Sequence, residues 1–159
     1  MVQTAIGYCE AKTLYRGRDQ IAGALRAEIA EVHDYFRHSL ACQLAEYLAS
    51  LDDTVVSVHT HSYGDAEEEG ESRSCYVTAP INLILHVRRK TAALSSVIAS
   101  LDESLLADYK ALVAPKGQKM ASLLDVQMVD DEDVEKGLGF GVVLKSTYNR
   151  PVRLWARGS

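Results

Sequence analysis

The sequence has few of the features that assign a protein to a class at first sight. It contains three cysteines, Cys9, Cys42 and Cys75, and they stand more than thirty residues apart. No Cys-x-x-Cys pair is therefore present to bind zinc or to exchange disulfides, and the odd number argues against a disulfide framework. This cysteine usage predicts a reducing compartment.

Long hydrophobic runs are also missing. No window reaches the roughly 18 apolar residues that a membrane span needs. The first 15 residues carry no basic segment followed by an apolar stretch, which a secretory signal requires. These absences predict a soluble, cytoplasmic protein without a membrane partner.

Charge of neither sign dominates. The chain carries 17 Lys and Arg against 22 Asp and Glu, a net charge of -5 at pH 7, and is 47% hydrophobic and 25% charged. This composition is that of an ordinary globular chain and excludes a disordered or low-complexity protein. The net charge gives no overall attraction to nucleic acid. A length of 159 residues predicts a single domain over 1–159.

Motifs for catalysis or cofactor binding are scarce. There is no Gly-x-Ser-x-Gly nucleophile elbow. The glycines of 137–141 lack the spacing of a phosphate loop and enter a predicted strand rather than a helix, so we interpret them as a turn with a bulge. We therefore expect no cofactor, and an enzyme is not the favoured class.

Apolar spacing predicts one long helix in the N-terminal third. From Asp19, a residue type favoured at helix N-caps, apolar residues recur every three or four positions up to about Leu51. Such a helix of about 32 residues is about 48 Å long and overhangs a small domain. Residues 1–17 lack clear periodicity and are predicted to form an N-terminal arm with a short strand.

The period then changes to two, which is typical of strands. Residues 54–63 and 75–88 are predicted to form a hairpin around the acidic loop 65–71. Pro80 cannot donate to a β-ladder, so the second strand is predicted to lie at an edge or to contain a bulge there.

The rest of the chain predicts more helix and more strand. Residues 91–113 read as a helical region, which a capping box at Ser100–Glu103 divides into two helices. Residues 124–128 and 138–144 alternate as strands around an acidic turn, and a short strand lies at 152–156 in the tail 150–159. The expected fold is α+β, with the helices on one face of a mainly antiparallel sheet of four to five strands.

His59 and His61 form the most suggestive local signal. The string His-Thr-His-Ser at a strand end resembles the metal-binding opening of the polymerase-and-histidinol-phosphatase phosphoesterases, and residues two apart on a strand face the same way. A hairpin centred near Glu68 places His59 opposite about Thr78, with His86 roughly 26 Å further along. Solvent-facing or interface histidines are therefore favoured over a metal site.

The order of elements also resembles a degenerate nucleotidyltransferase fold. The nearest counterparts of its signature are Ser62 on the first strand, and Pro80 and Asn82 on the second. Asp125 on the third strand matches the later carboxylate of that family. The acidic pair that holds metal in that family is not present. This resemblance and the metal-dependent phosphoesterase remain the alternatives to a non-enzymatic function.

Charge is separated along the chain, which favours contacts between like subunits. Acidic residues gather in 65–71 and 130–135, and basic residues in 88–90 and the tail. Basic side chains interleaved with Tyr148 and Trp155 also allow a weak charge contact with nucleic acid. The candidate interface residues are Asp65, Glu67, Glu68, Glu69, Arg150, Arg153, Trp155 and Arg157.

The order helix, long hairpin with an acidic loop, helix and C-terminal hairpin resembles the tail-terminator and tail-completion proteins of tailed bacteriophages. The likeness covers about residues 50–150 and lies in topology rather than in a diagnostic motif. It implies a homo-oligomeric ring, commonly a hexamer, that contacts tail-tube and connector proteins and catalyses nothing. For a phage-derived protein it also implies location in the virion.

Overall fold

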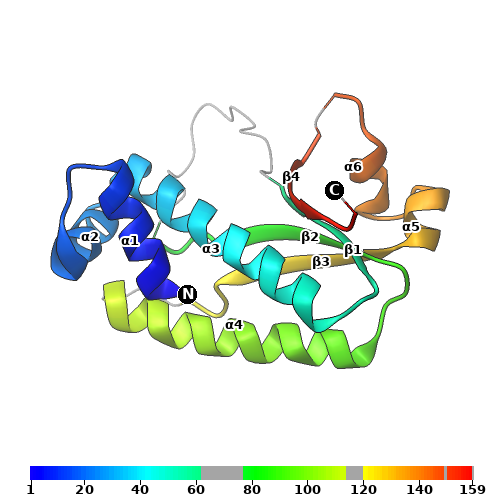
Figure 1. Ribbon diagram of the computed structural model, residues 1–159, viewed down its shortest axis with the longest axis horizontal. Helices are drawn as coiled ribbons and strands as arrows, with labels where there is room; N and C mark the ends of the chain where they lie inside the picture. The colour runs from blue at the N-terminus through cyan, green and yellow to red at the C-terminus, as the bar shows by residue number, and fades with distance from the viewer. Residues whose placement is uncertain (62–76, 114–119, 149, 159) are drawn as a thin grey trace.

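Helices and one sheet make up the computed structural model, which describes residues 1–61, 77–113, 120–148 and 150–158 (Figure 1). In chain order the elements are α1 (Val2–Lys12), α2 (Gly17–Arg26), α3 (Ala30–Leu51), β1 (Val55–Thr60), β2 (Ile81–Val87), α4 (Ala92–Val113), β3 (Leu124–Asp130), α5 (Asp131–Lys136), α6 (Gly141–Lys145) and β4 (Val152–Ala156). The α+β class predicted from the sequence is confirmed.

The sheet is mixed, with strand order β3-β2-β1-β4. β1 pairs antiparallel with β2, as the predicted hairpin requires, and antiparallel with β4. β3 pairs parallel with β2, because α4 carries the chain back along the sheet before β3 begins. β2 begins at Ile81, directly after Pro80, which has no backbone N–H to give to a ladder.

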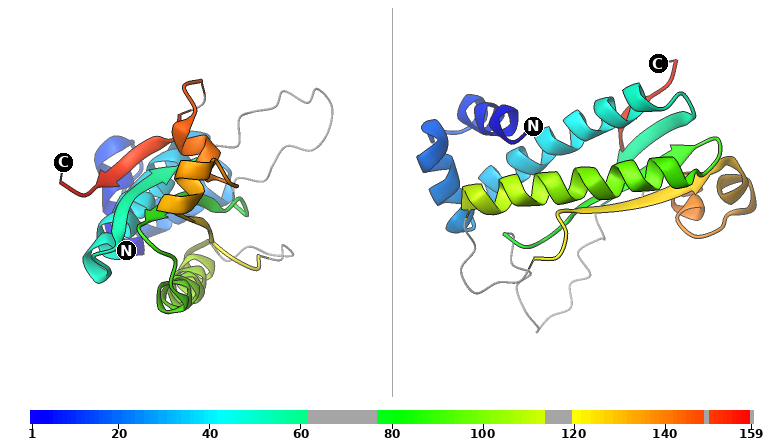
Figure 2. Two further views of the ribbon diagram at one scale, coloured as in Figure 1. Left: turned by 90° about the vertical axis from the view of Figure 1, so that its right-hand side faces the viewer. Right: turned by 90° about the horizontal axis from the view of Figure 1, so that it is seen from below.

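The main core lies between the sheet and the two long helices. Figure 2 shows α3 and α4 side by side over one face of the sheet. Phe36, Leu40 and Leu44 of α3 are buried with Leu83 and Leu85 of β2 in one cluster. From α4, the Tyr109 hydroxyl donates to the carbonyl of Val77 over 2.7 Å. In the described part of the chain, no helix combines the length and the apolar character that a membrane span needs.

The predicted single helix from Asp19 to Leu51 is wrong. The chain leaves the helix after Arg26 and starts α3 at Ala30, and between them Glu28 takes a positive φ of 58°. His33 holds this turn, since its Nε2 lies 2.8 Å from the carbonyl oxygen of Leu25, the residue before the last one of α2. Two shorter helices therefore pack inside the domain, and the overhang expected from one long helix does not arise.

The predicted arm at residues 1–17 is also wrong, because most of it is α1. Ala5, Ile6 and Cys9 are fully buried in the core. The Cys9 thiol donates to the carbonyl of Val32 in α3, and burial raises its pKa to about 11. Cys9 is thus a core residue that joins α1 to α3.

Two further local predictions fail. α4 is one continuous helix, so Ser100 does not start a new helix. Residues 138–144 do not form a strand: α5 ends at Lys136, with Gly137 as its C-cap, and α6 begins at Gly141. A Cβ on Gly141 would lie 2.4 Å from the carbonyl oxygen of Asp133, so glycine is needed for α6 to approach α5. The short strand predicted at 152–156 is confirmed as β4.

Candidate functional site

The sheet has a second face, turned away from α3 and α4, that carries most of the polar candidates from the sequence. Side chains alternate along each strand, and the register places those of one face next to one another. We call this surface the polar face; its polar members are Ser57, His59, Asn82, His86, Asp125, Gln127 and Arg153. Ile84 and Val129 lie among them and are buried, although neither belongs to the main core.

His59 is the most strongly perturbed group of the polar face. Its Nε2 lies 2.9 Å from Ser57 Oγ, and Ser57 is itself buried. Burial, followed by the charges of Arg153 and His86, lowers the pKa of His59 to about 4. At neutral pH the imidazole is therefore uncharged. His59 is half-buried and not fully solvent-facing, and its place in an interface stays a prediction.

Two buried polar atoms on this face have no hydrogen-bond partner among the described residues. They are Nδ1 of His59 and Oδ1 of Asn82. A serine hydroxyl beside a neutral imidazole is the pairing that activates a nucleophile in hydrolases. In those enzymes a third group orients the base. In the described part of the chain no group bonds the Nδ1 atom that this orientation would use.

The hairpin register differs from the predicted one and brings two histidines together. His59 pairs with Ile84 rather than with Thr78, and His86 is only two residues further along β2. The predicted separation of roughly 26 Å therefore shrinks to about 7 Å along the strand. His86 also binds the neighbouring element, since its Nε2 lies 2.8 Å from Asp131 Oδ1 at the start of α5.

The structure does not gather a metal site from the predicted ligands. His61 lies edge-on to the ring of Phe140 at a centroid distance of 6.1 Å, while His59 is bonded to Ser57. Within the described ranges, no three His, Cys, Asp or Glu side chains are arranged to hold a metal ion. Asn82 and Asp125, counterparts in the nucleotidyltransferase resemblance, are direct partners on β2 and β3. Ser62 lies outside the described residues.

The candidate interface residues divide into three groups. Asp65, Glu67, Glu68 and Glu69 lie outside the described residues. Arg150 and Arg153 are exposed next to or on β4. Trp155 and Arg157 instead make contacts within their own chain. The Arg157 guanidinium lies 5.3 Å from the centroid of the Trp155 ring, and Arg157 Nε donates to the carbonyl of Val55 over 2.9 Å.

Acidic side chains concentrate at the opposite edge of the sheet. β3 runs directly into α5, whose capping box joins Asp130 and Asp133 through each other's backbone N–H groups. Asp131 and Glu132 are exposed there. Lys90 forms an ion pair with Asp133, which lowers the pKa of that carboxyl, so part of the basic run 88–90 is neutralised within the chain. Figure 1 shows α5 and α6 at the end of the sheet far from α1 and α2.

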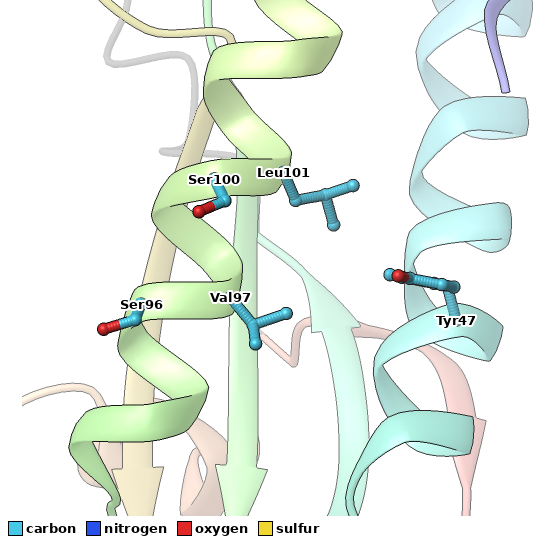
Figure 3. A pocket seen from close by; sticks show the side chains of 5 residues that line it. All are labelled: Tyr47, Ser96, Val97, Ser100 and Leu101. Atoms are coloured by element: carbon cyan, nitrogen blue, oxygen red, sulfur yellow. The ribbon is translucent and has the colours of Figure 1, made fainter.

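A shallow groove of about 390 Å³ lies between α3 and α4 (Figure 3). Tyr47 of α3 points toward Val97 and Leu101 of α4, while Ser96 and Ser100 point away from α3. Tyr47 is 41% exposed and Val97 37% exposed. The helical spacing alone could not identify this surface, because Val97 and Leu101 belong to the same apolar pattern as the core residues of α4.

Comparison of the chain with protein-family models, with curated proteins and with solved structures gave no match. The function is therefore inferred from the arrangement of the described side chains and strand edges. Two features of that arrangement stand out: the polar face, with buried Ser57 and half-buried His59, and the opposite charges at the two edges of the sheet.

Proposed function

We propose that this protein is a structural subunit that assembles with copies of itself into a closed ring, as the resemblance to tail-terminator and tail-completion proteins implies. The observation that carries the proposal is the opposite charge of the two sheet edges. β3 and the start of α5 carry Asp125, Asp130 and Asp131, whereas β4 carries Arg153, and Arg150 lies shortly before it.

This arrangement favours contact between different edges of two copies. A contact between two β3 edges would bring carboxylates together, and a contact between two β4 edges would bring guanidinium groups together. A contact between unlike edges pairs opposite charges. Such head-to-tail contacts close into rings when the rotation between subunits allows it. In a phage tail, tube and connector proteins are the partners that this ring would contact.

The mass in solution tests the proposal. At micromolar concentration and moderate salt, light scattering coupled to size exclusion should give a multiple of the 17.5 kDa subunit mass, with six copies expected from the resemblance. Electron microscopy of the same fraction should show particles with rotational symmetry. A monomeric mass, or open filaments without closed particles, would overturn the ring.

A further inference from the structure

The outer edge of β3 presents backbone groups that the sheet itself does not use. The N–H of Ile81 donates to the carbonyl of Leu123 over 2.8 Å. In a parallel ladder, alternate residues of a strand direct both their N–H and C=O groups toward the same neighbour, and this hydrogen bond shows which residues do so. Asp125, Gln127 and Val129 direct their backbone groups toward β2. The N–H and C=O groups of Leu124, Val126, Met128 and Asp130 then point outward.

Both ends of this edge are capped, and its middle is open. Asp102 of α4 accepts the N–H of Leu124 over 2.9 Å. Asp133 accepts the N–H of Asp130 over 3.2 Å. For Val126 and Met128, the described residues provide no partner across the outer edge, since β3 is the last strand of the sheet. The open stretch therefore offers two donors and two acceptors to an added strand.

A groove runs beside this open stretch and has room for the side chains of an added strand. It holds about 330 Å³ and lies between β3 and α4. Ile98, Val126 and Met128 give it an apolar floor, and Ser95 and Ala99 of α4 are small enough to leave space. Grooves between a helix and an edge strand are where extended segments add to a sheet.

We propose that this edge receives β4 of a second copy of the chain, so that the sheet continues from one subunit into the next. This inference rests on the proposed function and names the surfaces that make the ring. β4 is the other edge strand, and its Val152 is 63% exposed. Arg153 of β4 lies on the polar face, as does Asp125 of β3, so a continued sheet places both charges on the same side of the junction.

The direction of pairing follows from ring symmetry. The rotation that relates the subunits of a ring does not reverse direction along the ring axis. β1 of every subunit therefore runs in the same direction along that axis. β3 and β4 are both antiparallel to β1, because β3 is parallel to β2. β4 of one copy therefore lies parallel to β3 of the next. A two-fold pairing of β3 with itself would instead bring the acidic side chains of both copies to one junction.

Exchange of the two charges tests the pairing. In Asp125→Arg or Arg153→Asp alone, every junction holds like charges, and the concentration needed for half-assembly should rise at least about tenfold. In the double variant every junction again holds opposite charges, and assembly should return. Asp108→Arg, a charge reversal at an exposed position of α4, serves as the matched control and should assemble like the wild type. Circular dichroism checks that each variant is folded.

Amide hydrogen exchange gives a second reading that does not need substitutions. In the assembled protein the amides of Val126 and Met128 should exchange slowly, and in the dispersed Arg153→Asp variant they should exchange fast. The amide of Gln127, which faces β2, should stay protected in both. If the wild type assembles but its Val126 and Met128 amides exchange freely and the charge exchange has no effect, the edge pairing is overturned while the ring survives. A monomeric wild type overturns both.

Discussion

A neutral imidazole at the centre of the polar face makes the protein sensitive to acid. His59 is half-buried beside Ser57, and burial with the nearby Arg153 and His86 lowers its pKa to about 4. The unfolded chain takes up this proton near the ordinary pKa of about 6.5. Stability from His59 is therefore complete above pH 6.5 and is lost as the pH falls from there toward about 4.

We expect the free energy of unfolding to fall between pH 6.5 and pH 4, and His59→Gln to reduce this slope because it removes the titrating group. Urea unfolding at half-unit steps of pH measures the slope. His33 also has a pKa lowered by burial, so part of the slope should remain in the variant. An unchanged slope in His59→Gln would contradict the assignment of this proton to His59.

Among the helices, α5 and α6 depend on one glycine for their packing. Gly141 approaches the backbone of Asp133 and Val134 so closely that an added Cβ would lie 2.4 Å and 2.9 Å from their atoms. Backbone atoms cannot move aside as a flexible side chain can. Gly141→Ala should therefore destabilise the protein by about 1–3 kcal/mol, the typical cost of overpacking.

Gly7→Ala is the control for that substitution. Gly7 also lies in a helix, α1, but among the described residues nothing lies within 4 Å of the added Cβ. Alanine should stabilise this site by about 0.5–1 kcal/mol through helix propensity. Thermal or urea unfolding compares the two variants. Equal effects of the two substitutions would show that the close approach of α6 to α5 does not matter for stability.

The helices and strands predicted from the sequence were correct where a single residue pattern determines the element. They were wrong where tertiary packing determines it. The alternation in β1 and β2 gave both strands and their antiparallel pairing. The break between α2 and α3 gave no signal, because Ile29 and Val32 continue the apolar spacing of Ile21 and Leu25. The residue with positive φ there is Glu28 rather than a glycine. Alternation across 138–144 predicted a strand, but the close approach at Gly141 produces a short helix.

Part of the candidate site could be predicted from the same residue alternation. The period of two in residues 54–63 implies that Ser57 and His59 share one face of the strand, and the structure places them so. The predicted distance from His59 to His86 was wrong, because the hairpin register depends on where the loop is centred. β2 begins at Ile81, after Pro80, which is later than the alternation suggests. The open edge at Val126 and Met128 could not be predicted, because edge position depends on strand order. That order brings β4, the last element, beside β1.

For the whole molecule, salt distinguishes two ways in which copies could associate. The junction between β3 and β4 relies on opposite charges, which salt screens: the Debye length falls from about 10 Å at 0.1 M to about 3 Å at 1 M. The groove between α3 and α4, with Tyr47 and Val97, is apolar, and contacts of this kind gain strength in sulfate or phosphate.

We therefore expect the concentration for half-assembly to rise about tenfold between 0.1 M and 1 M sodium chloride, because salt weakens the attraction between the opposite charges at the junction of β3 and β4. Light scattering over a dilution series at each salt concentration measures this quantity. The Asp125→Arg, Arg153→Asp double variant should show the same dependence, since its junction carries the same charges in reversed positions. Assembly that does not change with sodium chloride but tightens in sodium sulfate would contradict the charged junction and move the contact to the groove between α3 and α4.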